Sequence, residues 1–414
     1  MASAPSAPAV PELKSGQLLN LITATAASTV GFWAWTVIGP LSARYTQTLD
    51  LNPSQASILV AMPILVGSLA RIPVGAWTDR YGGRRMFTLV LGTTAPLVLL
   101  TALAGESGSY ALLIIVAFFL GIAGTVFAIG IPFCSAWYDR SRKGFATGVF
   151  GAGMVGTAVS AFFTPRLVAG VGYFNAHLII AGVVALMAGI SWLVLRESPA
   201  WSRPTEPTLP KIRHAFTHKA TWQLCFLYGI VFGAFVAFSN YLPTYLGNVY
   251  DWDATDAGTR TAGFAVAAVI ARPVGGTIAD KIGPRIVTLV SFAGTVVLAM
   301  VVAFQPSQER VYGTAFLLMA VFLGLGTGGV FAWVGRVTPP KDVGTVGGII
   351  AAAGGLGGYF PPLVMGATYD AENSSYFVGL TLLAVFAALA LLLTFTVRNG
   401  GKADERAAAP SSHA

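Results

Sequence analysis

Charged residues and cysteines are both scarce in this sequence. Charged residues make up 10% of its 414 positions, whereas a soluble globular protein carries about 25%. The two cysteines, Cys134 and Cys225, both lie inside apolar segments, and no CxxC, HExxH or His/Cys cluster accompanies them. These absences exclude a soluble globular protein and a disulfide framework, and we expect neither a metal site nor a cofactor.

The net charge of +8 does not indicate a nucleic-acid-binding protein. The lysines and arginines fall in short segments between apolar stretches and form no continuous basic face. We therefore expect no nucleic-acid partner.

Long apolar stretches dominate the chain instead. Apolar residues make up 55% of it, and the mean hydropathy is +0.70. A helix of about 20 apolar residues crosses the hydrocarbon core of a bilayer. The predicted fold class is an all-α polytopic membrane protein with twelve transmembrane helices surrounded by lipid. The stretches cover residues 18–41, 55–78, 86–104, 110–136, 145–165, 173–195, 221–246, 259–279, 286–304, 311–335, 344–367 and 376–397.

The basic residues predict the orientation of these helices. Twelve spans place both termini on one side, and most lysines and arginines fall in the loops of that side. Positive charge is retained in the cytoplasm, so we expect a multi-pass cell-membrane protein with both termini cytoplasmic, and we expect it to be a monomer. Only four arginines fall in the loops of the other side, namely Arg44, Arg166, Arg260 and Arg310.

A repeat divides the chain into two homologous halves. Arg71, Gly75, Asp79 and Gly82 recur 201 residues later, as Arg272, Gly276, Asp280 and Gly283. Duplicated six-helix halves are common in transporters. The predicted organisation is a disordered tail at 1–17, a six-helix bundle at 18–195, a linker at 196–220, a second bundle at 221–397 and a disordered tail at 398–414.

Two arginines lie inside apolar stretches. Arg71 precedes Asp79, which marks a helix end, by eight residues, or about 12 Å of helix within a core about 30 Å thick. Arg272 occupies the same place in the second half. No Asp or Glu lies at that depth, so the sequence offers no carboxylate partner. A guanidinium at this depth needs a partner, and we interpret the two arginines as a site for a transported anion. The alternative is that each arginine bonds backbone carbonyls or snorkels to the membrane interface.

The loop motif Gly75-x-x-x-Asp79-Arg80-x-Gly82-Gly83-Arg84, with its echo from Gly276 to Gly283, resembles the signature of the major facilitator superfamily. The paired arginines and two glycine-rich helices resemble, within it, the nitrate/nitrite porters. The resemblance implies that Phe127 and Tyr228 contact the anion, with Trp35 and Asn240 as weaker candidates. Met154 is a further candidate for the substrate site. Family members usually carry Asn at this position, so the polar contact to the anion is missing here or is supplied by another residue. For gating, the implied residues are Asp79, Arg80, Asp280, Lys281, Gly153, Gly156, Gly354 and Gly355.

The predicted function is secondary transport of nitrate and nitrite, and not enzymatic catalysis. A carrier for another small anion, such as formate, oxalate or another monocarboxylate, is the alternative. Transport is expected as nitrate/nitrite exchange or nitrate/proton symport. Two facing cations without a carboxylate repel one another and cannot relay protons, which favours exchange slightly.

Overall fold

The computed structural model describes residues 12–139, 142–199, 201–202, 208–338 and 343–398. Within these ranges the secondary structure is helical, with one isolated antiparallel bridge between Asp370 and Ser375 and no strand. The first half contains α1 (Glu12–Trp35), the 3₁₀ turn η1 (Gly39–Leu41), α2 (Ser42–Thr48), α3 (Pro53–Leu69), α4 (Arg71–Tyr81), α5 (Gly83–Glu106), α6 (Tyr110–Leu120), η2 (Gly121–Thr125), α7 (Val126–Ala136), α8 (Lys143–Gly151), η3 (Ala152–Val155), α9 (Gly156–Val171) and α10 (Tyr173–Val194).

The second half follows the helix α11 (Thr208–Ala215), which lies in the predicted linker. Its elements are α12 (Lys219–Tyr250), α13 (Ala254–Ile282), α14 (Pro284–Ala303), α15 (Glu309–Val337), α16 (Val343–Gly357), α17 (Phe360–Ala367) and α18 (Phe377–Thr394).

These helices form twelve candidate membrane spans among the described residues. Each overlaps one of the twelve predicted apolar stretches, so the predicted fold class is confirmed. Five spans contain a break or bend: α1 with η1 and α2, α3 with α4, α6 with η2 and α7, α8 with η3 and α9, and α16 with α17.

The N-terminal boundary differs from the prediction. The segment 1–17 was predicted to be disordered, but α1 begins at Glu12, so residues 12–17 are helical. Pro11 is the last proline of the tail, and Glu12, Leu13 and Lys14 after it are good helix formers. The remaining tail residues, 1–11 and 399–414, lie outside the described part of the chain.

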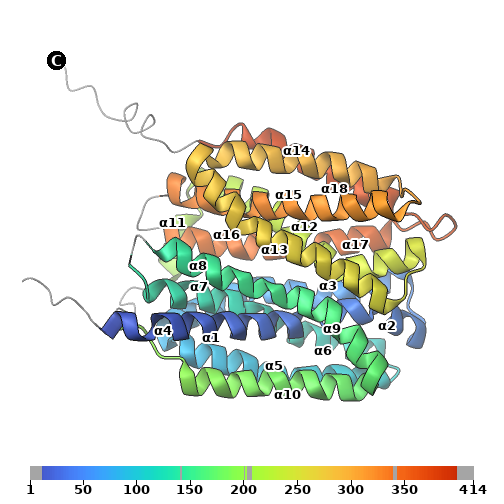
Figure 1. Cartoon of the computed structure of the whole chain (residues 1–414), viewed down its shortest axis with the longest axis horizontal. Helices are drawn as coiled ribbons and strands as arrows, with labels where there is room; N and C mark the ends of the chain where they lie inside the picture. The colour runs from blue at the N-terminus through green and yellow to red at the C-terminus, as the bar shows by residue number, and fades with distance from the viewer. Residues whose placement is uncertain (1–11, 140–141, 200, 203–207, 339–342, 399–414) are drawn as a thin grey trace, which may run out of the picture.

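The helices pack as two bundles, one from each half of the chain. In the first, α10 packs against α5 and α1; in the second, α15 packs against α13 and α14, and α14 against α18. Figure 1 shows the first bundle (blue to green) on one side of the molecule and the second (yellow to red) on the other. It also shows α8 and α11 at one end and α2 at the opposite end. We call the end with α8 and α11 the termini face and the end with α2 the far face.

The sequence repeat corresponds to a repeated turn. Gly82 between α4 and α5 has φ of 88°, and Gly283 between α13 and α14 has φ of 100°. Both angles lie in the region that favours glycine. The arginine next to each turn also makes an equivalent contact: Arg84 Nε donates to the Trp192 carbonyl at the end of α10, and Arg285 Nη2 donates to the Val397 carbonyl after α18. Each loop is thus tied to the last helix of its own bundle.

Glycines in α13 and α15 allow the two backbones to approach closely. A Cβ at Gly275 would overlap the Leu325 carbonyl oxygen, and a Cβ at Gly328 would overlap the Arg272 carbonyl oxygen. Small residues at a helix interface permit this separation. The contact holds the Arg272 backbone at a defined position beside α15.

Candidate functional site

Arg71 begins α4 at a break in its membrane span. Pro73 has no N–H to bond the Leu69 carbonyl, and α3 ends at Leu69. The Arg71 side chain is 3% exposed. Its Nη1 donates to the Ala351 carbonyl of α16, in the other half, at 2.8 Å, and its Nε donates to the Gly124 carbonyl at 3.4 Å. Its Nη2 has no hydrogen-bond partner among the described residues, so one buried donor group is available to an anion.

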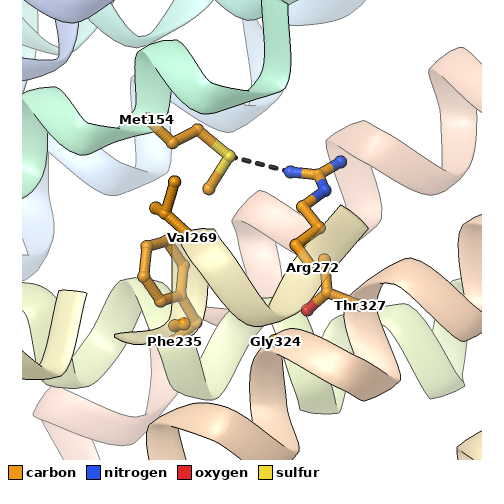
Figure 2. Close-up of a pocket in the computed structure, with 7 residues that line it drawn as sticks. Met154, Phe235, Val269, Arg272, Gly324 and Thr327 are labelled. Atoms are coloured by element: carbon orange, nitrogen blue, oxygen red, sulfur yellow. Dashed lines mark hydrogen bonds between the residues drawn. The ribbon is translucent and has the colours of Figure 1, made fainter. Parts of the chain in front are cut away.

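Arg272 lies within the continuous helix α13. Its Nη1 lies 2.8 Å from the Met154 Sδ of η3, and its Nη2 donates to the Tyr228 hydroxyl of α12 at 3.2 Å. Figure 2 shows the Met154 thioether pointing toward this guanidinium from the neighbouring helix. The Met154 contact joins the first half of the chain to the second.

Two phenylalanine rings lie against both guanidinium groups. The Cζ atoms of Arg71 and Arg272 are each 5.4 Å from the centroid of the Phe127 ring, and 5.8 and 5.9 Å from that of Phe232. The two Cζ atoms are therefore no further apart than twice 5.4 Å. Cation–π contact of this kind contributes about 0.5–2 kcal/mol to a charged side chain. Residues 201 positions apart in sequence thus share one aromatic environment.

Tyr228 completes this arrangement. Its ring stacks on Phe232 with centroids 5.0 Å apart and an interplanar angle of 7°, and its side chain is fully buried. The structure therefore brings together Arg71, Arg272, Phe127, Tyr228 and Met154, and we call these five residues with Phe232 the arginine site.

Phe232 and Phe331 were missed by the sequence analysis. Phe232 is four residues after Tyr228, a spacing that places both on one helix face, so it could have been found. Phe331 of α15 lies 5.7 Å from the Arg272 Cζ and 5.4 Å from the Tyr228 ring centroid. Nothing local in the sequence distinguishes Phe331 from the other phenylalanines.

Trp35 forms one wall of the arginine site. Its ring centroid is 5.7 Å from the Arg71 Cζ, and its Nε1 donates to the Pro63 carbonyl at 2.8 Å. Because its only hydrogen-bond donor is occupied by the backbone, Trp35 supports Arg71 rather than offering a polar group to a substrate.

Asn240 lies away from the arginine site. It is twelve residues beyond Tyr228 on α12, which corresponds to about 18 Å of helix toward the far face. Its Nδ2 donates to Val236, and its backbone carbonyl packs against Gly39. Asn240 therefore belongs to the contact between the halves near the far face and does not meet the arginines.

The partners of the two arginines are carbonyl, thioether and hydroxyl groups. The alternative of backbone carbonyl bonds is thus realised in part, at Arg71. Breaks at Ala70, η2 and η3 lie beside these side chains. Irregular backbone at membrane depth is tolerated where it is buried in protein or lines a cavity, which agrees with a substrate site here.

Comparisons with known proteins extend over nearly the whole chain. The model of the Major Facilitator Superfamily matches residues 24–362 and 252–412. A probable nitrate/nitrite transporter, NarK2 of Mycobacterium tuberculosis, is 54% identical over 379 residues, or 92% of this chain and 96% of that protein. The nitrite extrusion protein of Bacillus subtilis is 34% identical over 371 residues, or 88% and 90%.

The chain belongs to the major facilitator superfamily. The identities to these relatives place it among the nitrate/nitrite porters, so the resemblance seen in the sequence is confirmed. A solved bacterial homolog of the human lysosomal transporter Spinster, in an inward-facing and occupied conformation, matches with a TM-score of 0.72, covering 93% of this chain and 97% of that chain. At 18% identity it shows the major facilitator fold alone.

The glycines of this porter predicted for gating make two kinds of contact. A Cβ at Gly355 would lie 2.9 Å from Arg71 Nη1, and one at Gly354 would overlap the Tyr228 ring. By contrast, Gly153 and Gly156 pack against Ser28 and the Thr29 carbonyl of α1, within their own bundle. Gly354 and Gly355 therefore make room for the arginine site, while Gly153 and Gly156 allow α1 to approach the helix that carries Met154.

The superfamily loop residues lie at the termini face. Asp79 lines a cavity of about 20 Å³ with Thr78 and Glu197, and Lys211 of α11 acts on it electrostatically. Arg80 stacks on Tyr81, while Asp280 and Lys281 are exposed.

Glu197, which the sequence analysis did not single out, caps the N-terminus of α5. Its Oε1 accepts from the Arg84 backbone N–H at 2.8 Å. The carboxylate that caps α5 is therefore Glu197, while Asp79 lines the neighbouring cavity. Arg336 makes a related contact in the second half, since its Nη2 donates to the carbonyls of Ala279 and Asp280 at the end of α13.

Proposed function

We propose that this porter carries nitrate and nitrite across the cell membrane by alternating access, with the arginine site as the substrate site. The observation that carries the proposal is the convergence of Arg71 and Arg272, one from each half, on the same two phenylalanine rings. The names of the relatives in Mycobacterium tuberculosis and Bacillus subtilis support nitrate and nitrite as substrates.

The chemistry of the site suits a small planar oxyanion. A guanidinium presents parallel N–H donors that match the oxygens of a planar anion, and the buried Arg71 Nη2 is such a donor. The rings of Phe127 and Phe232 lie beside both cations, with their centroids 6.4 Å apart. An anion there adds the negative charge that neither arginine obtains from its carbonyl, thioether and hydroxyl partners.

Transport requires that the two halves of the chain move against one another around this site. Arg71 reaches Ala351 in the second half, and Arg272 reaches Met154 in the first. An anion held by both arginines would bridge the halves at the same level. We further propose that the termini face is cytoplasmic, following the positive charge of its loops, and that the porter acts as a monomer.

Counterflow of labelled nitrate in proteoliposomes tests the proposed substrate. Unlabelled nitrate and nitrite inside the vesicles should drive uptake of the label, whereas formate, oxalate and chloride should not compete at equal concentration. Preferential competition by formate or oxalate would replace nitrate with a carboxylate substrate, which is the alternative from the sequence.

Exchange and proton symport would both use the arginine site. An imposed proton gradient distinguishes these two modes of transport. Vesicles with an empty lumen and an inward proton gradient are exposed to labelled nitrate. Accumulation with acidification of the lumen identifies symport with protons. Uptake that requires internal nitrite or nitrate identifies exchange.

A further inference from the structure

The contact between Met154 and Arg272 crosses the interface between the two halves. Met154 lies in η3, a 3₁₀ segment between α8 and α9, and such segments within a helix often mark hinges. Its Sδ lies 2.8 Å from Arg272 Nη1 in the second half. A movement of one half against the other must therefore change this distance.

The thioether is a particular kind of partner for a guanidinium. Sulfur in methionine is a weak acceptor and has no hydrogen to donate, so it compensates the cation only slightly. A nitrate or nitrite oxygen forms a charge-assisted hydrogen bond, which is about twice as strong as a neutral one. An arriving anion would therefore displace Met154 from Arg272 at small cost.

A small, mostly apolar cavity lies beside Met154. The cavity measures about 10 Å³ and is lined by Phe235, Val269 and Thr327 in addition to Met154 and Arg272 (Figure 2). Its lining is mostly apolar, and methionine is unbranched with three rotatable bonds. The thioether thus has apolar neighbours and flexible torsions with which to change its rotamer when an anion takes its place at Arg272.

We infer that Met154 serves as an internal, displaceable acceptor for Arg272 that allows the porter to close and reorient without a bound anion. The inference rests on the proposed function and adds a role for Met154 in how transport is coupled. When the arginine site closes without an anion, a buried guanidinium donor with no acceptor is costly. Met154 Sδ lowers that cost at Arg272 Nη1, as the Ala351 carbonyl does at Arg71 Nη1, while Arg71 Nη2 keeps no partner among the described residues.

The inference predicts how the rate of net uptake compares with the rate of exchange. Exchange requires the porter to cross only with an anion bound, whereas net uptake requires it to return without one. The Met154 acceptor is used in the return step, when the anion is absent from Arg272. Loss of this acceptor should therefore slow net uptake more than it slows exchange.

The test compares Met154→Leu, Met154→Gln and wild type in proteoliposomes whose membrane potential is clamped. Leucine keeps the volume but removes the acceptor, while glutamine keeps the length and supplies a carbonyl acceptor. Met319→Leu on α15 is the matched control, since Met319 is fully buried and outside the arginine site. Labelled nitrate uptake is measured with an empty lumen for net flux and with internal nitrate for exchange.

We expect Met154→Leu to lower the ratio of net flux to exchange about tenfold, the rate change that corresponds to one weak hydrogen bond to a partly buried charge. Met154→Gln should restore the ratio, and Met319→Leu should leave it unchanged. An unchanged ratio in Met154→Leu would overturn the inference, as would a wild-type porter that exchanges nitrate but shows no net flux. If wild type transports no nitrate in either assay, the proposed function fails instead.

Discussion

The interface between the two halves is packed differently toward its two faces. In the part near the far face, backbones approach closely: a Cβ at Gly258 would overlap the Ala161 carbonyl oxygen, and one at Gly39 would lie 2.5 Å from the Asn240 carbonyl oxygen. Nearer the termini face, by contrast, a Cβ at Gly148 of α8 or at Gly348 of α16 would meet no atom within 4 Å. The structure therefore represents a conformation closed at the far face.

Three side-chain hydrogen bonds also join the two halves near the far face. Near the far face, the Ser42 and Thr244 hydroxyls are 2.5 Å apart, the Ser57 and Tyr241 hydroxyls are 2.9 Å apart, and Arg166 Nη2 donates to Thr259 at 2.8 Å. These are neutral or singly charged partners, and each contributes about 1 kcal/mol. Closure at the far face thus depends on several weak bonds and on glycine contacts, all of which can separate when that face opens.

The largest expected effect concerns the arginine site, which lies between the two packed regions. Arg71→Lys and Arg272→Lys keep the charge but lose the planar fork, so nitrate counterflow should fall about 100-fold. Expression and thermal stability should change little, because neither interface region is altered. Counterflow near the wild-type rate in either variant would show that the guanidinium is structural and not part of the substrate site.

A large side chain at Gly258 should prevent closure at the far face. In Gly258→Leu the side chain would occupy the space of the Ala161 carbonyl, and transport should fall at least about tenfold. A Thr244→Cys reporter, in a variant without Cys134 and Cys225, should then react with a membrane-impermeant maleimide applied at the far face.

Gly263 supplies the control on the same helix, since a Cβ there meets no atom within 4 Å. Gly263→Leu should transport normally and leave the reporter protected. If Gly258→Leu behaves in the same way, the glycine contact is not what holds the far face closed.

Gly148→Leu tests the region near the termini face. It should lower transport less than Gly258→Leu does, and it should leave the reporter at the far face protected. Its side chain has room in the present conformation, but closure at the termini face would bring the halves together there. Transport should fall roughly three- to tenfold while the Thr244→Cys reporter stays protected. Labelling of the reporter in this variant would contradict the division of the interface into two alternating regions.

The smallest effect is expected at Glu197, at the termini face. Burial raises the pKa of this carboxyl above its ordinary value, against the lowering effect of the Arg84 and Gly83 backbone N–H groups and of Arg84 and Arg85. Since the folded pKa is raised, the wild type loses stability as pH rises from the unfolded value through the folded value. Glu197→Gln keeps the acceptor without the charge and should melt slightly higher at neutral pH.

The melting temperatures of wild type and Glu197→Gln should converge as the pH is lowered, because protonated Glu197 also carries no charge. Glu197→Ala removes the acceptor for the Arg84 N–H and should melt lower than wild type at both pH values. A gap between wild type and Glu197→Gln that does not depend on pH would mean that burial of the charge is not its cause.

Much of the architecture could be predicted from the sequence. Twelve spans follow from hydropathy, which sums over neighbouring residues and does not depend on tertiary contacts. The two halves follow from the repeated motif that contains Gly82 and Gly283. Both glycines have a positive φ, which explains why the motif carries glycine in each half. The superfamily could be recognised from the same residues.

The site could be predicted only in part. Arg71 and Arg272 were identified because a charge at membrane depth is costly wherever the helix packs. Phe127, Tyr228 and Met154 came from the resemblance to the porters. Asn240 was a weaker candidate from the same resemblance, and the twelve residues of helix that separate it from Tyr228 place it outside the site.

By itself, then, the sequence determined the spans, the repeat and the depth of the two arginines, because the spans and the depth depend on neighbouring residues and the repeat is a match between two short segments. Only the tertiary structure decided which groups the arginines meet. The absence of a carboxylate at their depth favoured exchange, but the folded chain supplies the Ala351 carbonyl and the Met154 thioether instead. Each partner comes from the opposite half of the chain. Contacts between residues so far apart in the sequence leave no local pattern from which they could be predicted.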